Sequence, residues 1–474
     1  MLLSPLQVDS MDPQEIPMVV VRDLTVTDFE NVTTPVGRDI SAVPEPYSEA
    51  RTRRFQRVFS AARTGSFAIL GQALFAGANF VANVLLARWL TPDQYGAFAL
   101  AYACFLLFLM LYSACVYEPL IVFGSGRYAS RFPDYFGLLI RGNTYVLATL
   151  SGLMLATSVL LSFLFPDGVQ RDFMALSLAA PFVLVTWLGR GGFYAQLKPG
   201  KAAWGGAFYF FTLVVAFGLL RQYCQLSGST AFLAMGVAGL VSSVFLFSRL
   251  RFNAKRFSGD FRLRDVARDH WSYGRWALAT AAIAWFPDNI YYAILPGRAG
   301  LAGTAGLRAL VNLFNPVLHT QVALSAVLIP LLVRRKQGLG IPGMVKTLRT
   351  LLALVIPASV GYLAVLWSLR PWLFKLLYNG KYREYAGWPF LLVGLIPVLT
   401  GATLVLGSAL RAIEHPKLIF WGYATAGASA LIVGLPLVRM FGVIGAAVGL
   451  LISTSTATLA LAWLLRRQTQ QASP

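Results

Sequence analysis

The chain has 474 residues, of which 57% are hydrophobic and only 13% are charged. Soluble proteins average roughly 45–50% apolar and about 25% charged residues, so this composition excludes an ordinary soluble enzyme and indicates that lipid surrounds most of the chain. In a soluble protein, a net charge of +20 would indicate a nucleic-acid partner. In a membrane protein it first indicates basic cytoplasmic loops, so we expect no nucleic-acid partner.

The first segment of the chain is acidic and rich in proline. Residues 1–49 contain nine acidic and two basic residues, and no basic stretch followed by an apolar core marks a secretory signal. We therefore expect a disordered acidic cytoplasmic tail over 1–60. A docking segment for a partner, or a true start at Met11 or Met18, are the alternatives. The basic run over 51–57 then predicts contact with anionic lipid headgroups before the first helix.

Twelve apolar runs of membrane-spanning length follow this tail. A bilayer core about 30 Å thick needs roughly 20 helical residues, and each run approaches that length between charges or Pro and Gly turns. The sequence therefore predicts an all-α polytopic membrane protein with about twelve transmembrane helices. They lie at about 66–87, 96–117, 143–165, 174–195, 203–220, 230–248, 274–295, 304–332, 348–369, 386–409, 418–438 and 442–464.

The basic residues between these runs predict the orientation. Segments on the side of the N-terminus contain 27 Lys and Arg residues, whereas the opposite loops contain nine. Because basic loops stay in the cytoplasm, we expect both termini to be cytoplasmic.

Two short sequence patterns that recur in both halves predict a duplication into two six-helix lobes around a central cavity. We place the lobes at 61–250 and 274–465, with a basic linker at 251–273 and a cytoplasmic tail at 466–474. Lobes with an even number of helices share one orientation, which predicts a cleft between them near the bilayer midplane. In the first pattern, Pro199-x4-Trp204-Gly205 matches Pro416-x4-Trp421-Gly422. In the second, Asn83 and Ala87 match Asn289 and Ala293.

A polar stripe on one predicted helix is the first candidate site. Arg308, Asn312 and Asn315 recur at helical spacing, and His319 extends the same face. Because ionisable groups at membrane depth tend to line cavities, we interpret this face as a substrate-binding cavity wall. Snorkelling of Arg308 to the interface is the alternative. Further polar, uncharged positions at membrane depth are Gln72, Asn79, Asn83, Asn289 and Gln321.

Asp288 is a candidate coupling residue. It follows Pro287, which we expect to break the helix and free backbone carbonyls. A carboxylate there could bind a coupling cation or a proton. The alternative is an ion pair with Arg308 across the hairpin between the seventh and eighth helices.

Arg190 is a second candidate substrate-binding residue. It lies eight residues before Lys198, which places it about 12 Å below the cytosolic loop. Gly189, Gly191 and Gly192 leave room around it for a bulky headgroup or for close helix packing. Snorkelling to the inner interface is the alternative.

No catalytic or metal-binding arrangement can be assembled from the sequence. His270, His319 and His415 lie on different predicted elements, and the three cysteines show neither metal nor disulfide spacing. We therefore expect no enzyme activity, no metal and no cofactor. A membrane glycosyltransferase or polymerase, an alternative class, would usually have a large outer loop. The longest one here, at about 370–385, carries Lys375, Lys381, Arg383 and Glu384. We interpret these charges as solvated, with a substrate contact as the alternative.

Several motifs carry a family resemblance over about residues 60–465. They are Leu-Leu-Ala-Arg-Trp-Leu-Thr-Pro-Asp-Gln-Tyr-Gly at 85–96, Asp288-Asn289 followed by Gly297, Gly300 and Gly303, Leu410-Arg411-Ala412-Ile413 with Pro416-Lys417, and Phe441-Gly442-Val443 with Gly445-Ala446-Ala447. At these residues the chain resembles the O-antigen (Wzx-type) polysaccharide flippases of the multidrug/oligosaccharidyl-lipid/polysaccharide exporter superfamily. The acidic N-terminal segment departs from the family's short N-terminus.

The resemblance implies a function, a location and partners. The implied activity is the transfer of an undecaprenyl-diphosphate-linked oligosaccharide from the cytoplasmic to the outer leaflet of the bacterial inner membrane. Implied partners are this lipid-linked substrate, membrane lipids, and polysaccharide polymerase and chain-length proteins. A cation-coupled drug exporter of the same superfamily is the alternative. It usually needs a deep acidic residue in the first lobe, where only Glu118 occurs, at a helix end.

Overall fold

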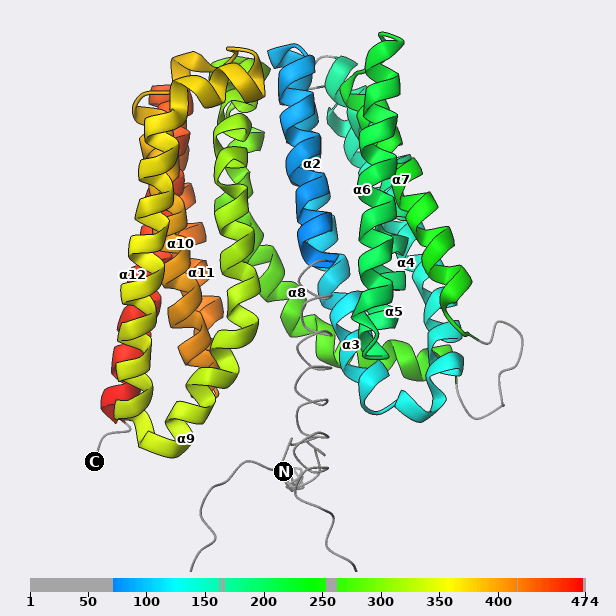
Figure 1. The fold of residues 1–474 in the computed structure, drawn as a ribbon, viewed down its shortest axis with the longest axis vertical. Helices are drawn as coiled ribbons and strands as arrows, with labels where there is room; N and C mark the ends of the chain where they lie inside the picture. Colours follow the sequence, from blue (N-terminus) through cyan, green and yellow to red (C-terminus); the bar gives the residue numbers. More distant parts are fainter. Residues whose placement is uncertain (1–70, 162, 164–166, 253–261, 416, 472–474) are drawn as a thin grey trace, which may run out of the picture. The chain divides into compact units, whose positions relative to one another are not determined.

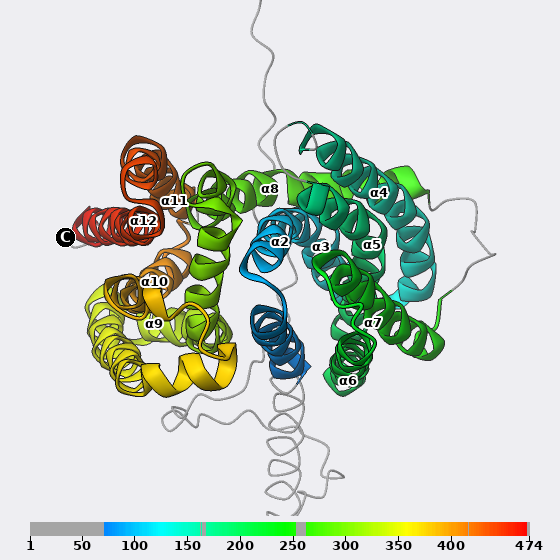
Figure 2. The same cartoon turned by 90° about the horizontal axis from the view of Figure 1, so that it is seen from above.

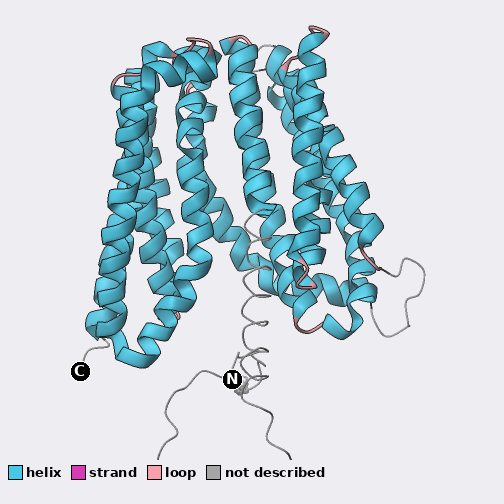
Figure 3. Cartoon of the chain, viewed as in Figure 1, coloured by secondary structure: helices cyan, strands magenta, loops and turns pink. Residues whose placement is uncertain are grey.

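The computed structural model describes residues 71–471 apart from 162, 164–166, 253–261 and 416. Their regular secondary structure is helical throughout, without strands (Figure 3). Eight helical stretches in the described part are long and apolar enough to cross a membrane. The predicted class, an all-α polytopic membrane protein, is confirmed. The predicted acidic tail over 1–60 and the basic run over 51–57 lie outside the described residues.

The first half contains a helix over 71–89 and the elements up to α7. Thr91 caps α2 reciprocally with Gln94, and Ser227 caps α7 with Thr230, which satisfies amide groups that a helix start leaves free. The elements are α2 (Pro92–Tyr112), a π-helical turn (Ser113–Tyr117), α3 (Glu118–Ser125), a 3-10 turn (Ala129–Arg131), α4 (Phe132–Leu161), α5 (Asp167–Ala195), α6 (Pro199–Gln222) and α7 (Gly228–Arg249).

The second half contains fewer but longer helical elements, because kinked helices join end to end. Gly300 and Gly340 in α9 and Gly442 in α12 have φ angles of 67°, 67° and 56°, which glycine adopts without steric cost. The helical stretches Pro296–Tyr378 and Lys417–Gln471 therefore each contain two predicted spans. The elements are α8 (Leu263–Ile294), α9 (Pro296–Tyr378), a 3-10 turn (Arg383–Tyr385), α10 (Trp388–Ala412), α11 (Lys417–Ser429), a π-helical turn (Ala430–Gly434) and α12 (Leu435–Gln471).

Within residues 71–471 the helices form two groups. Helices α2 to α7 lie on one side and α9 to α12 on the other, and α8 passes between them (Figures 1 and 2). The groups meet where α2 packs against α8 and α9. The first part of α8 contacts the first half through the π-helical turn and α4, and other parts of the helix pack against α11 and α12. This arrangement makes α8 the connection between the halves.

The repeated Pro-x4-Trp-Gly pattern corresponds to the same packing in both halves. Gly205 in α6 lies directly against Leu246 of α7, and Gly422 in α11 lies directly against Leu461 of α12. At either glycine an added Cβ would overlap the leucine side chain. The two halves therefore share this glycine–leucine contact, and their duplication stays a prediction.

Some predicted helix boundaries and one predicted break are wrong. Helix α4 begins at Phe132 rather than at 143, and α8 begins at Leu263 rather than at 274, because their amphipathic first turns lie outside the apolar run. Pro287 does not break α8, which continues through it to Ile294. The proline is buried and costs the helix one backbone hydrogen bond without ending it.

Candidate functional site

A cavity of about 230 Å³ lies between the two halves. The helix over 71–89 and α2, α5, α6 and α7 line one side, and α9 lines the other. Its position matches the predicted central cavity. The contribution of α9 is Arg308, Asn315 and His319, so these three residues of the predicted polar stripe line the cavity.

The stripe on α9 runs from the closed end of the cavity toward its mouth. Arg308 is 6% exposed, Asn315 is half-buried and His319 is exposed. Eleven residues of helix separate Arg308 from His319, which corresponds to about 16 Å along the axis. The facing helix over 71–89 shows the same gradient in the opposite chain direction, since Asn83 is 2% exposed, Asn79 half-buried and Gln72 exposed. The cavity therefore deepens toward Arg308 and Asn83.

Arg308 is held at the closed end by neutral groups. Its Nε donates to Asn83 Oδ1 at 3.1 Å, and the Tyr95 hydroxyl donates to the same oxygen at 3.3 Å. The guanidinium carbon lies 4.7 Å from the centroid of the Tyr102 ring and 5.9 Å from that of Tyr292. Among the described residues no carboxylate forms an ion pair with it. A buried cation balanced by amide oxygen and aromatic faces retains a favourable interaction for an incoming anion.

Arg190 lies beside the same cavity and is fully buried. One terminal nitrogen approaches Gln72 Oε1 at 3.4 Å and the Gly71 carbonyl at 3.5 Å. Its guanidinium lies 4.7 Å from the centroid of Phe75 and 5.3 Å from that of Trp187, and both rings line the cavity. Nε and the other terminal nitrogen have no hydrogen-bond partner within the described part of the chain. The side chain is therefore enclosed by protein instead of snorkelling to the surface.

Asn312 and Asp288 lie outside the cavity lining. Asn312 is buried and accepts a hydrogen bond from Asn315 Nδ2 at 3.1 Å, so it orients a lining residue from behind. Asp288 is exposed, and no ion pair joins it to Arg308 in the part of the chain that the structure describes. The ion pair expected between Asp288 and Arg308 is therefore wrong, because proximity in sequence suggested it and Arg308 faces Asn83 instead.

The end of the cavity beyond Arg308 is closed by polar and backbone contacts between the halves. Lys381 Nζ donates to the carbonyls of Arg88 at 2.9 Å and Leu90 at 2.6 Å, and Arg88 donates to the carbonyl of Leu376. Burial, and secondarily Arg221, lowers the pKa of Lys381 below its usual value of 10.5. The prediction that Lys381 is a solvated charge is wrong, because it is half-buried and joins the two halves.

A glycine allows the closest approach at this end. Gly96 of α2 lies against the backbone of Leu301 in α9, and a Cβ there would overlap the Leu301 carbonyl. The next layer of the closure is aromatic, since the Tyr95 ring lies 6.4 Å from that of Tyr382. The cavity is therefore sealed on the side where α2 begins.

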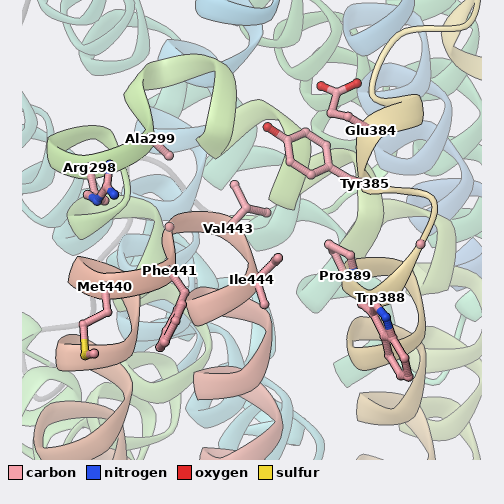
Figure 4. A pocket seen from close by; sticks show the side chains of 12 residues that line it. Arg298, Ala299, Glu384, Tyr385, Trp388, Pro389, Met440, Phe441, Val443 and Ile444 are labelled. Atoms are coloured by element: carbon pink, nitrogen blue, oxygen red, sulfur yellow. The ribbon is translucent and has the colours of Figure 1, made fainter.

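A second cavity, of about 640 Å³, lies within the second half (Figure 4). It forms where the start of α9, the segment before α10 and the kink at Gly442 come together. Its charged lining residues, Arg298 and Glu384, are both exposed and lie apart, with Val443 between them in the view of Figure 4. Because it involves one half only, it cannot open and close by movement between the halves.

Sequence reasoning missed the aromatic side chains of the site. Phe75, Tyr102 and Trp187 surround the two arginines, but their spacing along the chain matches ordinary apolar helix faces. The polar residues of the facing helix carried a signal, because Gln72, Asn79 and Asn83 recur at helical spacing within an apolar run.

No family model matches the chain, and no curated protein matches it. Solved structures do match. One is an inward-facing multidrug resistance MATE family transporter of the MOP superfamily, with a TM-score of 0.70 and 13% identity over 85% of this chain and 98% of that chain. Another is the lipid II flippase MurJ in an inward closed conformation, with a TM-score of 0.67 and 14% identity over 86% of this chain and 87% of that chain. A third is an outward-facing multidrug resistance MATE family transporter, with a TM-score of 0.62 and 12% identity over 86% of this chain and 95% of that chain.

The fold is therefore that of MOP superfamily transporters. The likeness of fold covers most of this chain and most of each of those structures.

Proposed function

We propose that the protein is a transporter that moves a polyprenyl-diphosphate-linked oligosaccharide from the cytoplasmic to the outer leaflet, in support of polysaccharide export across a bacterial inner membrane. The observation that carries the proposal is the pair of buried arginines at the cavity between the halves. Arg308 lines it and Arg190 stacks on two of its aromatic rings. No Asp or Glu is among the lining residues found in the described part of the chain.

This cavity chemistry fits an anionic headgroup. A diphosphate cannot enter hydrocarbon unaided, because an isolated buried charge costs tens of kcal/mol on an idealised Born estimate. Arginine stays charged and can hold phosphate through two parallel hydrogen bonds. The amides of Asn79 and Asn315 offer donors and acceptors to sugar hydroxyls, while the lipid tail remains in the bilayer.

Transport by alternating access requires one end of the cavity to close while the other opens. The contacts of Lys381 and Gly96 close one end, and the exposed Gln72 and His319 mark the other. The charge distribution of the loops predicts that the open end is cytoplasmic. In this account the substrate enters from the cytoplasm, and separation of α2 from α9 releases it on the other side.

A cation-coupled multidrug exporter is the second candidate, since two of the similar structures are multidrug resistance MATE family transporters. The observation in its favour is Asp288, an exposed carboxylate with no ion pair to Arg308. We assign Asp288 to cation or proton coupling, which either substrate class could use. The cationic cavity favours an anionic substrate over a cationic drug.

Proteoliposomes containing the purified protein distinguish the two candidates. We expect a fluorescent polyprenyl-diphosphate oligosaccharide placed in one leaflet to equilibrate with the other faster than in protein-free vesicles, and a cationic dye not to move. Dye transport without movement of the lipid-linked oligosaccharide would overturn the proposal. An oligosaccharide lacking the diphosphate serves as the matched substrate control.

A further inference from the structure

An apolar cavity of about 370 Å³ lies in the first half, away from the two arginines. It is bordered by the π-helical turn of Ser113–Tyr117, by α4 and by the first turns of α8. Lining residues include Cys115 of the turn, Leu139 and Gly142 of α4, and Leu263 and Trp271 of α8. Pockets of this volume hold small ligands or parts of larger ones.

The two buried polar side chains of this lining, Asn143 and His270, are already partnered. Asn143 Oδ1 accepts a hydrogen bond from the Tyr112 hydroxyl at 2.8 Å. His270 Nδ1 donates to the Cys115 carbonyl at 2.9 Å, so its Nε2 accepts from the Tyr135 hydroxyl at 2.8 Å. Because these groups satisfy one another, the remaining free surface is apolar and matches a hydrocarbon chain.

Basic residues lie beside the cavity on α8. Arg264 and Arg268 are exposed, one helical turn apart, and neither forms an ion pair within the described part of the chain. Arg264 also lies one turn before the lining residue Ala267. Trp271, 60% exposed at the cavity, is a residue typical of the membrane interface.

The acidic residues of the same turns are engaged elsewhere. Asp269 Oδ2 accepts from Arg127 at 2.9 Å and from the Tyr128 hydroxyl. Asp265 Oδ2 accepts from the Arg262 amide at 3.3 Å. These contacts leave the arginine charges on this surface available to an anion.

We propose that this cavity binds an acyl chain of an anionic phospholipid whose phosphate is held by Arg264 and Arg268. Basic sites at the cytoplasmic ends of membrane helices suit anionic lipid headgroups, and the loop charges predict that this end is cytoplasmic. The bound lipid contacts both the π-helical turn and α8, the helix that joins the halves. It therefore stabilises the attachment of α8 to the first half, independently of what the central cavity transports.

Cys115 provides a native reporter of occupancy. In full-length protein carrying Cys104→Ala and Cys224→Ser, we measure the rate of N-ethylmaleimide labelling in mixed micelles with phosphatidylglycerol or phosphatidylcholine of matched chains. Phosphatidylglycerol at ten times its dissociation constant should slow labelling about tenfold. Phosphatidylcholine and glycerol phosphate should protect far less. The exposed Cys224, kept alone in a parallel protein, should be protected by neither lipid.

Variants on the two parts of the site complete the test. Arg264→Gln with Arg268→Gln should remove the preference for phosphatidylglycerol, whereas the exposed Arg349→Gln should not. Gly142→Val fills the cavity, and Gly152→Val, on the same helix with open space around it, is its control. Native mass spectrometry counts the phosphatidylglycerol that each folded variant retains. Absent or equal protection by the two lipids, or equal retention by Gly142→Val and Gly152→Val, would overturn the proposal.

Discussion

Arg308 Nε lies 3.1 Å from Asn83 Oδ1, although 225 positions separate the two residues in the chain. The bond joins α9 to the helix over 71–89 at the closed end of the central cavity. Asn83 also bonds its own helix, since its Nδ2 donates to the Asn79 carbonyl at 2.8 Å. This asparagine therefore fixes the position of the buried cation relative to the first half.

Replacing Asn83 with leucine should destabilise the protein more than the equivalent change in the second half. Asn289 makes the same local bond, to the Trp285 carbonyl at 3.0 Å, but within the described residues it makes no hydrogen bond to Arg308. Losing a hydrogen bond to a charged group costs about 1.5–3 kcal/mol. Asn83→Leu should therefore lower the free energy of unfolding more than Asn289→Leu does, by roughly that amount. Unfolding in mixed micelles measures both variants, and equal losses would contradict the role of Asn83.

Gly96→Val should prevent full closure beyond Arg308. A side chain there would overlap the Leu301 carbonyl, so α2 and α9 must separate. We expect spin labels on the starts of these helices to show a longer distance by electron paramagnetic resonance. Gly77→Val, on the adjacent helix with no atom near an added Cβ, is the control. An unchanged distance in Gly96→Val would show that this contact does not set closure.

Lys381→Met should favour the open state at the same end. It removes two hydrogen bonds to the Arg88 and Leu90 carbonyls, and partial exposure reduces the expected cost to about 1 kcal/mol. That corresponds to a several-fold rise in the open population. Cysteine cross-linking across the closure measures this population. Lys375→Met, which changes an exposed lysine of the same region, should leave it unaltered.

His270 should make the attachment of α8 sensitive to mild acid. Burial lowers its pKa below the usual 6.5, although the Cys115 carbonyl and Asp269 oppose the shift. The folded protein therefore favours the neutral ring, and its contribution to stability is present above pH 6.5 and declines as the pH falls toward the lowered pKa. Melting temperatures from pH 7.5 to 5 should fall more for the native protein than for His270→Gln. Parallel curves would refute this assignment.

Apolar runs bounded by charges or glycine and proline turns predicted the helices, because membrane spans depend on composition over about 20 residues. Contacts between helices were not predictable in this way. The stripe of Arg308 and Asn315 was found from its spacing, but its partner Asn83 is 225 positions away, and Asp288 was paired with it wrongly. The π-helical turn at Ser113–Tyr117 was also missed, because an added backbone residue per turn has no distinct composition.

Binding of a polyprenyl-diphosphate oligosaccharide to Arg308 variants tests the central claim most directly. Loss of a charge-assisted hydrogen bond to phosphate costs about 1.5–3 kcal/mol, so Arg308→Gln should weaken binding by about tenfold or more. Arg308→Lys should retain part of the affinity, and the exposed Arg349→Gln of the same helix should retain all of it. Native affinity in a folded Arg308→Gln protein would contradict the proposal that this cavity receives the diphosphate.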